Sequence, residues 1–187
     1  PQVHNGEHDM KVVAFNGSPH DQGNTVRLIR EVFATLEKHG IETELVQLGG
    51  HLIHGCTACG ACGRNKNGRC VIEGDLVNDC IARMREADGI LLASPTYFAD
   101  ITPELKALID RAGFVAGAND NFLKRKVGAS VIAVRRGGAI HAFDTINHFF
   151  LIRQMIVPGS CYWNMGLGRD TGEVEQDEEG IRTMTVL

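Results

Sequence analysis

Residues 12–25, VVAFNGSPHDQGNT, are expected to join a buried strand to the start of a helix through a short polar loop. The apolar run at 12–15 is typical of a strand inside a parallel sheet, because both faces of such a strand are covered. The NGSP sequence at 16–19 is a turn signal, and Asn24-Thr25 favours a helix N-terminus. A strand–loop–helix unit of this kind predicts an α/β fold.

The same alternation of strand and helix continues along the chain. Further strands are expected at residues 43–48, 89–93, 127–134 and 156–163. Five helices are expected between and after these strands. The first ends at Gly40, the second begins after a cap at Asp75, and the third begins at Pro103. The fourth runs from Ala139 to Gln154 with Ile140, Phe143, Ile146 and Phe150 inward, and the last runs from the acidic stretch 173–179 to Leu187. Five parallel strands with helices on both faces predict a doubly wound sheet in a single domain over residues 1–187, with residues 1–10 as a loose arm.

Charge and composition exclude two classes of partner. With a net charge of −4, the chain offers no broad basic patch for nucleic acid or an anionic membrane. No apolar run in the sequence reaches membrane-spanning length. Six cysteines without an evident signal peptide indicate a reducing compartment, so we expect a cytoplasmic protein. Cys80 and Cys161 fall within an expected helix and an expected strand, and we expect both to be buried core thiols.

The other four cysteines fall within fifteen residues, in the pattern Cys56-x2-Cys59-x2-Cys62-x7-Cys70. Three thiolates at this spacing, with a fourth further along, are typical of an iron–sulfur cluster. Structural zinc more often uses two separated pairs of ligands, so zinc fits less well. Disulfides or free thiols are a further alternative.

Three loops are expected at one edge of the sheet, where the carboxyl ends of parallel strands meet and ligands bind. Residues 16–25 precede a helix N-terminus and favour a phosphate, although a capped turn without a ligand fits equally well. Residues 94–98, SPTYF, suit a flat aromatic ring, unless the two aromatic residues only cover the core. Residues 135–138, RRGG, offer a cation to a ring carbonyl, unless they form a solvated turn. The cysteine loop is expected at this edge too, because it follows the second strand.

These loops together resemble a known family. Residues 16–19 with 23–25, residues 94–98, and Leu105-Lys106-x3-Asp110-Arg111 resemble the NADPH-dependent FMN reductase and iron–sulfur flavoprotein group of the flavodoxin-like superfamily. The similarity runs from about Lys11 to the end of the chain. It implies a flavodoxin-like sheet of order 2-1-3-4-5 that binds FMN. The cysteine motif is similar to that of members with an additional [4Fe–4S] cluster. The chain lacks the G-x-G-x-x-G turn of dinucleotide sites, which favours FMN over FAD.

The resemblance assigns roles to matching positions. The FMN phosphate is expected at Ser18, Pro19, Gly23, Asn24 and Thr25, with His20 where this loop often carries a basic residue. The isoalloxazine ring is expected along Pro95, Thr96, Tyr97 and Phe98, with Arg135, Gly137 and Gly138 beside it. A [4Fe–4S] cluster is expected on Cys56, Cys59, Cys62 and Cys70, in a loop that spans residues 55–73.

The expected function is that of a redox flavoprotein, which transfers electrons between a reduced donor and an acceptor through FMN and a [4Fe–4S] cluster. NAD(P)H and a ferredoxin-like protein are candidate donors, and no residue stands out as a general acid or base. The alternatives are an NAD(P)H-dependent FMN or quinone reductase without a cluster, and a flavin-free module that docks through a zinc-bound loop. The resemblance also places helix 103–114, with Asp110 and Arg111, at or near the interface of a homodimer or larger homo-oligomer. The family's last helix usually continues beyond the position of Leu187.

Overall fold

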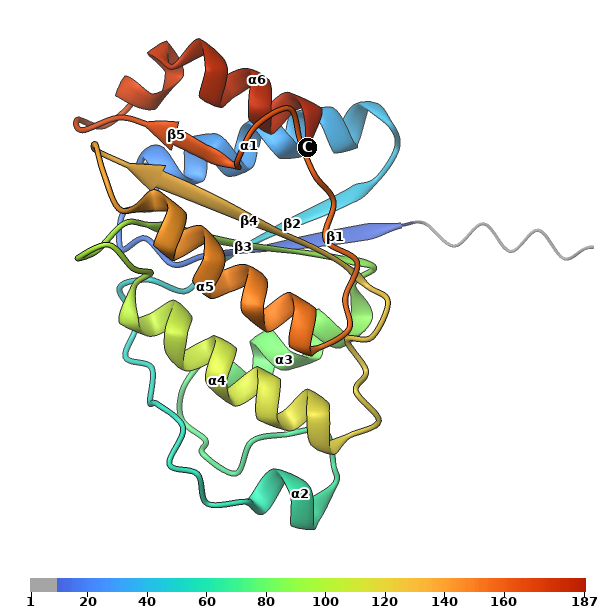
Figure 1. The fold of residues 1–187 in the computed structure, drawn as a ribbon. Helices are drawn as coiled ribbons and strands as arrows, with labels where there is room; N and C mark the ends of the chain where they lie inside the picture. Colours follow the sequence, from blue (N-terminus) through green and yellow to red (C-terminus); the bar gives the residue numbers. More distant parts are fainter. Residues whose placement is uncertain (1–9) are drawn as a thin grey trace, which may run out of the picture.

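The computed structural model describes residues 10–187 as a parallel sheet with helices on both faces (Figure 1). The strands lie in the order β2-β1-β3-β4-β5, and their bounds are β1 Lys11–Asn16, β2 Glu42–Gln47, β3 Gly89–Pro95, β4 Val127–Val134 and β5 Met165–Leu167. All neighbouring pairs are parallel. The expected order 2-1-3-4-5 is therefore confirmed. Residues 1–9, which make up most of the expected N-terminal arm, lie outside the described residues.

The helices divide between the two faces of the sheet (Figure 1). One face is covered by α1 (Asn24–Lys38) and α6 (Glu178–Val186), and the other by α3 (Val77–Glu86), α4 (Pro103–Ala118) and α5 (Ala139–Ile152). The short helix α2 (Ala61–Asn65) lies beyond α4, and a 3-10 helix, η1 (Glu173–Gln176), precedes α6. Covered on both sides, the central strands β3 and β4 are buried along nearly their whole length, which explains their continuous apolar sequence.

Hydrogen bonds at the ligand edge of the sheet tie its loops to one another and to the end of a neighbouring strand. The backbone N–H of Gly17 donates to the carbonyl of Ala93 at 2.8 Å, and the hydroxyl of Thr102 donates to the carbonyl of Gly17 at 2.9 Å. The N–H of Thr96 donates to the carbonyl of Ala133 at 2.9 Å. The loops after β1, β3 and β4 therefore share one edge, as the sequence predicts (Figure 1).

The expectations for the last third of the chain were partly wrong. Of the stretch expected as the fifth strand, residues 156–163, only Ile156 forms a single parallel bridge, with Val127, and β5 begins at Met165. Pro158 explains the break, because proline has no N–H to donate to a ladder. Cys161 consequently lies exposed in a bend instead of in the core. In α5, Ile140 is 42% exposed, because the inward face passes through Ala139 and Ala142.

Candidate functional site

The loop that follows β1 ends at a helix N-terminus that is open to an anion. Gly23 occupies the N-cap of α1, no side chain caps the helix, and no acidic residue lies in its first turn. The first backbone N–H groups of a helix have no partner within it, and they lie at the positive end of its dipole. The side chains of Ser18 and Thr25 are buried beside this turn. The arrangement is suited to a phosphate.

A buried amide, Asn16, and a half-buried one, Gln47, shape this loop, and sequence reasoning missed both. The Oδ1 of Asn16 accepts a hydrogen bond from the N–H of Ser18 at 3.0 Å, and its Nδ2 donates to Oε1 of Gln47 at 2.7 Å. The Nε2 of Gln47 donates to the carbonyls of Ser18 and Gly49, each at 2.7 Å. Asn16 and Gln47 are register partners at the ends of β1 and β2. A polar residue at the end of each strand was the available signal.

Asn24, by contrast, has its side chain engaged by the protein itself. Its Nδ2 donates to the carbonyl of Asp170 at 3.0 Å, and its Oδ1 accepts from the N–H of Gly172 at 2.8 Å. These bonds fasten the segment before η1 to the start of α1. A ligand at this loop would therefore meet the backbone N–H of Asn24, while its amide holds the loop in place.

The loop after β3 ends in a tight turn whose tip is exposed. The N–H of Tyr97 donates to the carbonyl of Asp100 at 2.7 Å, and the N–H of Asp100 donates back to the carbonyl of Tyr97 at 2.9 Å. Between them Phe98 and Ala99 have φ angles of 48° and 66°, in the left-handed region that is unfavourable for side chains other than glycine. The ring of Phe98 is fully exposed and Tyr97 is 44% exposed. The alternative in which both aromatics cover the core is therefore wrong, and strain of this kind is typical of ligand sites.

Gly138 brings the third loop against the second. Its φ is 91°, and a Cβ at this position would lie 2.7 Å from the Cα of Ala99. Both the backbone angle and the close approach require glycine. Arg135 and Gly137 are exposed beside it, and the N-terminus of α5 that follows has no side-chain cap.

The four cysteines of the motif line one cavity of about 120 Å³, together with Arg111, Phe114 and Val115 of α4. The cysteine loop leaves the ligand edge after β2 and continues along α4 to α2 (Figure 1). Its expected place at the ligand edge was therefore wrong. Arg111 follows Pro103 by eight residues, which corresponds to about 12 Å along the helix. The cavity lies beside the second half of α4.

Arg111 is the buried centre of this loop. Its side chain is fully buried and forms an ion pair with Asp75, whose side chain is 1% exposed. Its Nη1 and Nη2 also donate to the carbonyls of His54 and Ile72, at 3.1 and 2.7 Å. Its Nε lies 3.3 Å from the Sγ of Cys70. These partners all belong to the same chain, so Arg111 is not available to pair across a subunit interface.

The role expected for Asp75 as a helix cap also differs from what the structure shows. Asp75 accepts from the N–H of Val77 at 3.2 Å, although Leu76 occupies the N-cap position of α3. Burial tends to raise the pKa of Asp75, but hydrogen bonds from Arg111, His54 and Val77 outweigh it and hold that pKa below its usual value. Asp110 faces outward and pairs with Lys106 at 2.6 Å.

Cys59 in the cysteine loop and Cys80 in α3 have pKa values shifted in opposite directions. A hydrogen bond from the backbone of Ala61, with smaller contributions from Thr57 and Arg64, lowers the pKa of Cys59. The Sγ of Cys56 accepts from the N–H of Ala58 at 3.4 Å. Burial raises the pKa of Cys80 to about 12, and this thiol is in the core as expected. Within residues 10–187, no three His, Cys, Asp or Glu side chains are arranged to hold a single metal ion.

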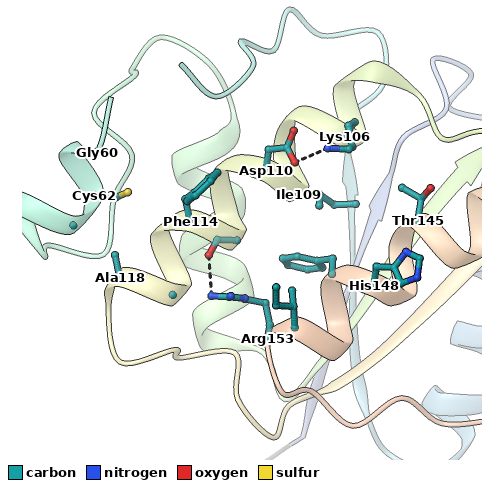
Figure 2. A pocket seen from close by; sticks show the side chains of 15 residues that line it. Gly60, Cys62, Lys106, Ile109, Asp110, Phe114, Ala118, Thr145, His148 and Arg153 are labelled. Carbon is teal, nitrogen blue, oxygen red and sulfur yellow. Dashed lines mark hydrogen bonds and ion pairs between the residues drawn. The ribbon is translucent and has the colours of Figure 1, made fainter. Parts of the chain in front are cut away.

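A larger groove of about 870 Å³ runs between α4 and α5 (Figure 2). Figure 2 shows Asp110 and Phe114 of α4 on one side, His148 of α5 and Arg153 just after α5 on the other, and Cys62 at one end. Phe114 is 60% exposed at its rim.

Among the described residues, no helix has the length and apolar character needed to cross a membrane.

A doubly wound parallel sheet of order 2-1-3-4-5, with an uncapped helix N-terminus at the β1 switch point, defines a flavodoxin-like protein. More particularly, the chain belongs to the NADPH-dependent FMN reductase family, which matches residues 10–170. It is thus an FMN-dependent oxidoreductase.

The relatives agree with this assignment. An iron-sulfur flavoprotein of Methanocaldococcus jannaschii is 37% identical over 93% of this chain and 91% of its own length. An iron-sulfur flavoprotein of Methanosarcina thermophila is 36% identical over 94% of this chain and 90% of its own. The fold is similar to that of the Trp repressor binding protein from Bacillus subtilis, with a TM-score of 0.69 at 17% identity over 94% of this chain and 98% of that one.

Proposed function

We propose that this flavoprotein holds FMN on the loops after β1, β3 and β4, carries a [4Fe–4S] cluster on Cys56, Cys59, Cys62 and Cys70, and transfers electrons between a reduced donor and an acceptor. FMN exchanges electrons singly or in pairs and a cluster exchanges them singly, so together they divide a two-electron reaction into one-electron steps. The observation that carries the proposal is the shared cavity of the four cysteines.

The residues of the loops after β1, β3 and β4 fit FMN. The open N-terminus of α1 would hold its phosphate through backbone N–H groups, beside the buried hydroxyls of Ser18 and Thr25. The exposed turn at Tyr97 and Phe98 would lie along the ring and exclude water from one side of it. Arg135 would face negative charge on the ring.

The cysteine cavity fits a cluster in its donor set. Four thiols surround one small space, and in a [4Fe–4S] cluster each would bind a different iron. Backbone N–H groups hydrogen-bond to Cys56 and favour the thiolate of Cys59, which is the form that binds metal. The iron–sulfur names of the relatives support the same assignment.

An NAD(P)H-dependent FMN or quinone reductase without a cluster is the second candidate. The family match favours it, since the family is described by that activity.

We further propose that two copies associate through the groove between α4 and α5, because its lining is mostly apolar and Phe114 is exposed at its rim.

Anaerobic purification separates the two candidates. The first predicts FMN, iron and inorganic sulfide, with four iron atoms for each FMN, and broad visible absorbance beneath the flavin bands. Protein with FMN alone, or with zinc in place of iron, would reject the cluster and favour the reductase. Colourless protein that fails to take up added FMN would reject both.

A further inference from the structure

One guanidinium donor of the buried Arg111 makes a hydrogen bond to a cysteine sulfur. Its Nε lies 3.3 Å from the Sγ of Cys70, and the other donors of the same buried group go to oxygen atoms of His54, Ile72 and Asp75. A neutral thiol is a weak acceptor, whereas a thiolate accepts a charge-assisted hydrogen bond from arginine. The contact therefore suits Cys70 as a deprotonated ligand.

The backbone at Cys70 has supports other than this bond. The Oδ1 of Asn78 accepts from the N–H of Cys70 at 2.8 Å, and its Nδ2 donates to the carbonyl of Cys70 at 3.0 Å. The Oδ1 of Asn119 accepts from the N–H of Gly68 at 2.8 Å. Two buried amides on α3 and at the end of α4 thus fix the backbone on both sides, which leaves the Nε of Arg111 to act on the sulfur itself.

We propose that Arg111 is a positioning residue which orients Cys70 and raises the reduction potential of the cluster through its Nε–H···Sγ bond. This inference rests on the proposed function. A reduced cluster carries one more negative charge than an oxidised one, so a cationic donor on a ligand sulfur stabilises the reduced state more. Hydrogen bonds to sulfur and local charge are among the factors that set such potentials. Asp75 holds the guanidinium in orientation, since it pairs with Nη1 and leaves Nε directed at Cys70.

The test is an EPR-monitored redox titration of the anaerobically purified protein and its Arg111→Lys variant. Lysine keeps a charge for Asp75 but lacks the planar fork that reaches two partners at once. We expect the cluster potential to shift to a more negative value while the flavin potentials stay unchanged. The control is Arg64→Gln, which removes a positive charge from the same loop. The Nη1 of Arg64 donates to the carbonyl of Cys59 at 2.9 Å and not to a sulfur, so Arg64→Gln should shift the cluster potential less than Arg111→Lys does.

An unchanged cluster potential in Arg111→Lys would overturn the inference and leave the proposed function intact. If that variant fails to fold or to keep its cluster, pulsed EPR on the reduced wild-type protein with ¹⁵N-labelled arginine decides instead. A weak coupling to an arginine nitrogen that survives Arg64→Gln supports the assignment, and no coupling rejects it. Wild-type protein without any cluster would overturn the proposed function, and this inference with it.

Discussion

Gly49 lies directly against the carbonyl group of Gly17: a Cβ on Gly49 would come within 2.4 Å of that oxygen. The same Cβ would lie 2.4 Å from the carbonyl oxygen of Ser18. The first residues after β2 therefore support the candidate phosphate loop from behind, before the chain continues to the cysteines. A side chain at Gly49 would have to displace backbone atoms, which cannot move aside as the end of a flexible side chain can.

Gly49→Ala should therefore weaken FMN binding. Overpacking of this kind costs about 1–3 kcal/mol, and here the strain falls on the loop expected to hold the phosphate. FMN titration of the apoprotein, followed by quenching of flavin fluorescence, should give a dissociation constant raised by about tenfold or more. Gly159→Ala is the matched control, since no atom lies within 4 Å of a Cβ there. Equal affinities in the two variants would place the phosphate elsewhere.

The buried hydroxyls of this loop give a second prediction. Replacing Ser18 and Thr25 together with valine removes two side-chain donors beside the α1 N-terminus. Each hydrogen bond lost to a charged phosphate is worth about 1.5–3 kcal/mol, so calorimetry should record a large loss of FMN affinity. Riboflavin, which lacks the phosphate, should lose much less. A similar loss for both flavins would mean that the variant disturbs the fold and not the phosphate contact.

Much of the fold follows from local patterns in the sequence. Residues 127–134 form β4 with the predicted bounds, and Pro103 begins α4 as predicted, because an apolar run and a proline each act over a few residues. The prediction for the last strand was wrong because tertiary packing, and not local sequence, decides which segment pairs with β4. Residues 156–163 have strand-like composition, but the edge of β4 pairs instead with Met165–Leu167, and the choice between two such segments depends on what packs above them.

For the candidate site, too, one part was predicted from the sequence and another was not. The three loops at the ligand edge were predicted because strand order alone brings them together. The buried environment of Arg111 was not predicted, since Asp75, Cys70 and His54 reach it from 36 to 57 residues away in the sequence. A single sequence carries no signal that an arginine in an amphipathic helix faces a wrapped loop and not solvent.

The third prediction concerns the cysteines. Cys59→Ser should lose iron and sulfide while FMN remains, because serine oxygen is a poor substitute for thiolate and the flavin loops are separate. Cys80→Ala is the control: its thiol is buried away from the cavity, so this variant should keep the cluster and lose only stability. Iron, sulfide and flavin analysis of anaerobically purified protein provides the measurement. Full iron content in Cys59→Ser would remove that residue from the ligand set.

The fourth prediction concerns acid stability of the apoprotein. The pKa of Asp75 is lower in the folded protein, so its ion pair stabilises the fold above the ordinary aspartate pKa of 3.8, and this contribution is lost as the pH falls through the folded pKa. Asp75→Asn should lower the free energy of unfolding at pH 7 by about 3–5 kcal/mol, because Arg111 stays buried without its partner. The variant should also lose less stability on acidification.

Urea unfolding at pH 7 and at several acidic pH values measures both effects. The control is Glu44→Gln, which breaks pairs with Lys11 and Arg83 at the surface. Exposed pairs contribute about 0–1 kcal/mol, so this variant should change little at pH 7. An Asp75→Asn protein as stable as Glu44→Gln would mean that Arg111 is compensated by another group.

The last prediction tests association through the groove between α4 and α5. Phe114 is 60% exposed at its rim and Ile152 is 67% exposed on the facing helix, so both sides of the groove present apolar surface to water. We expect the wild-type protein to sediment as at least a dimer at micromolar concentration. Phe114→Glu should shift it to the monomer, because association would bury an unpaired charge. Val186→Glu, on the opposite face in α6, should leave the sedimentation coefficient unchanged. A wild-type monomer, or a Phe114→Glu protein that stays oligomeric, would contradict the proposed interface.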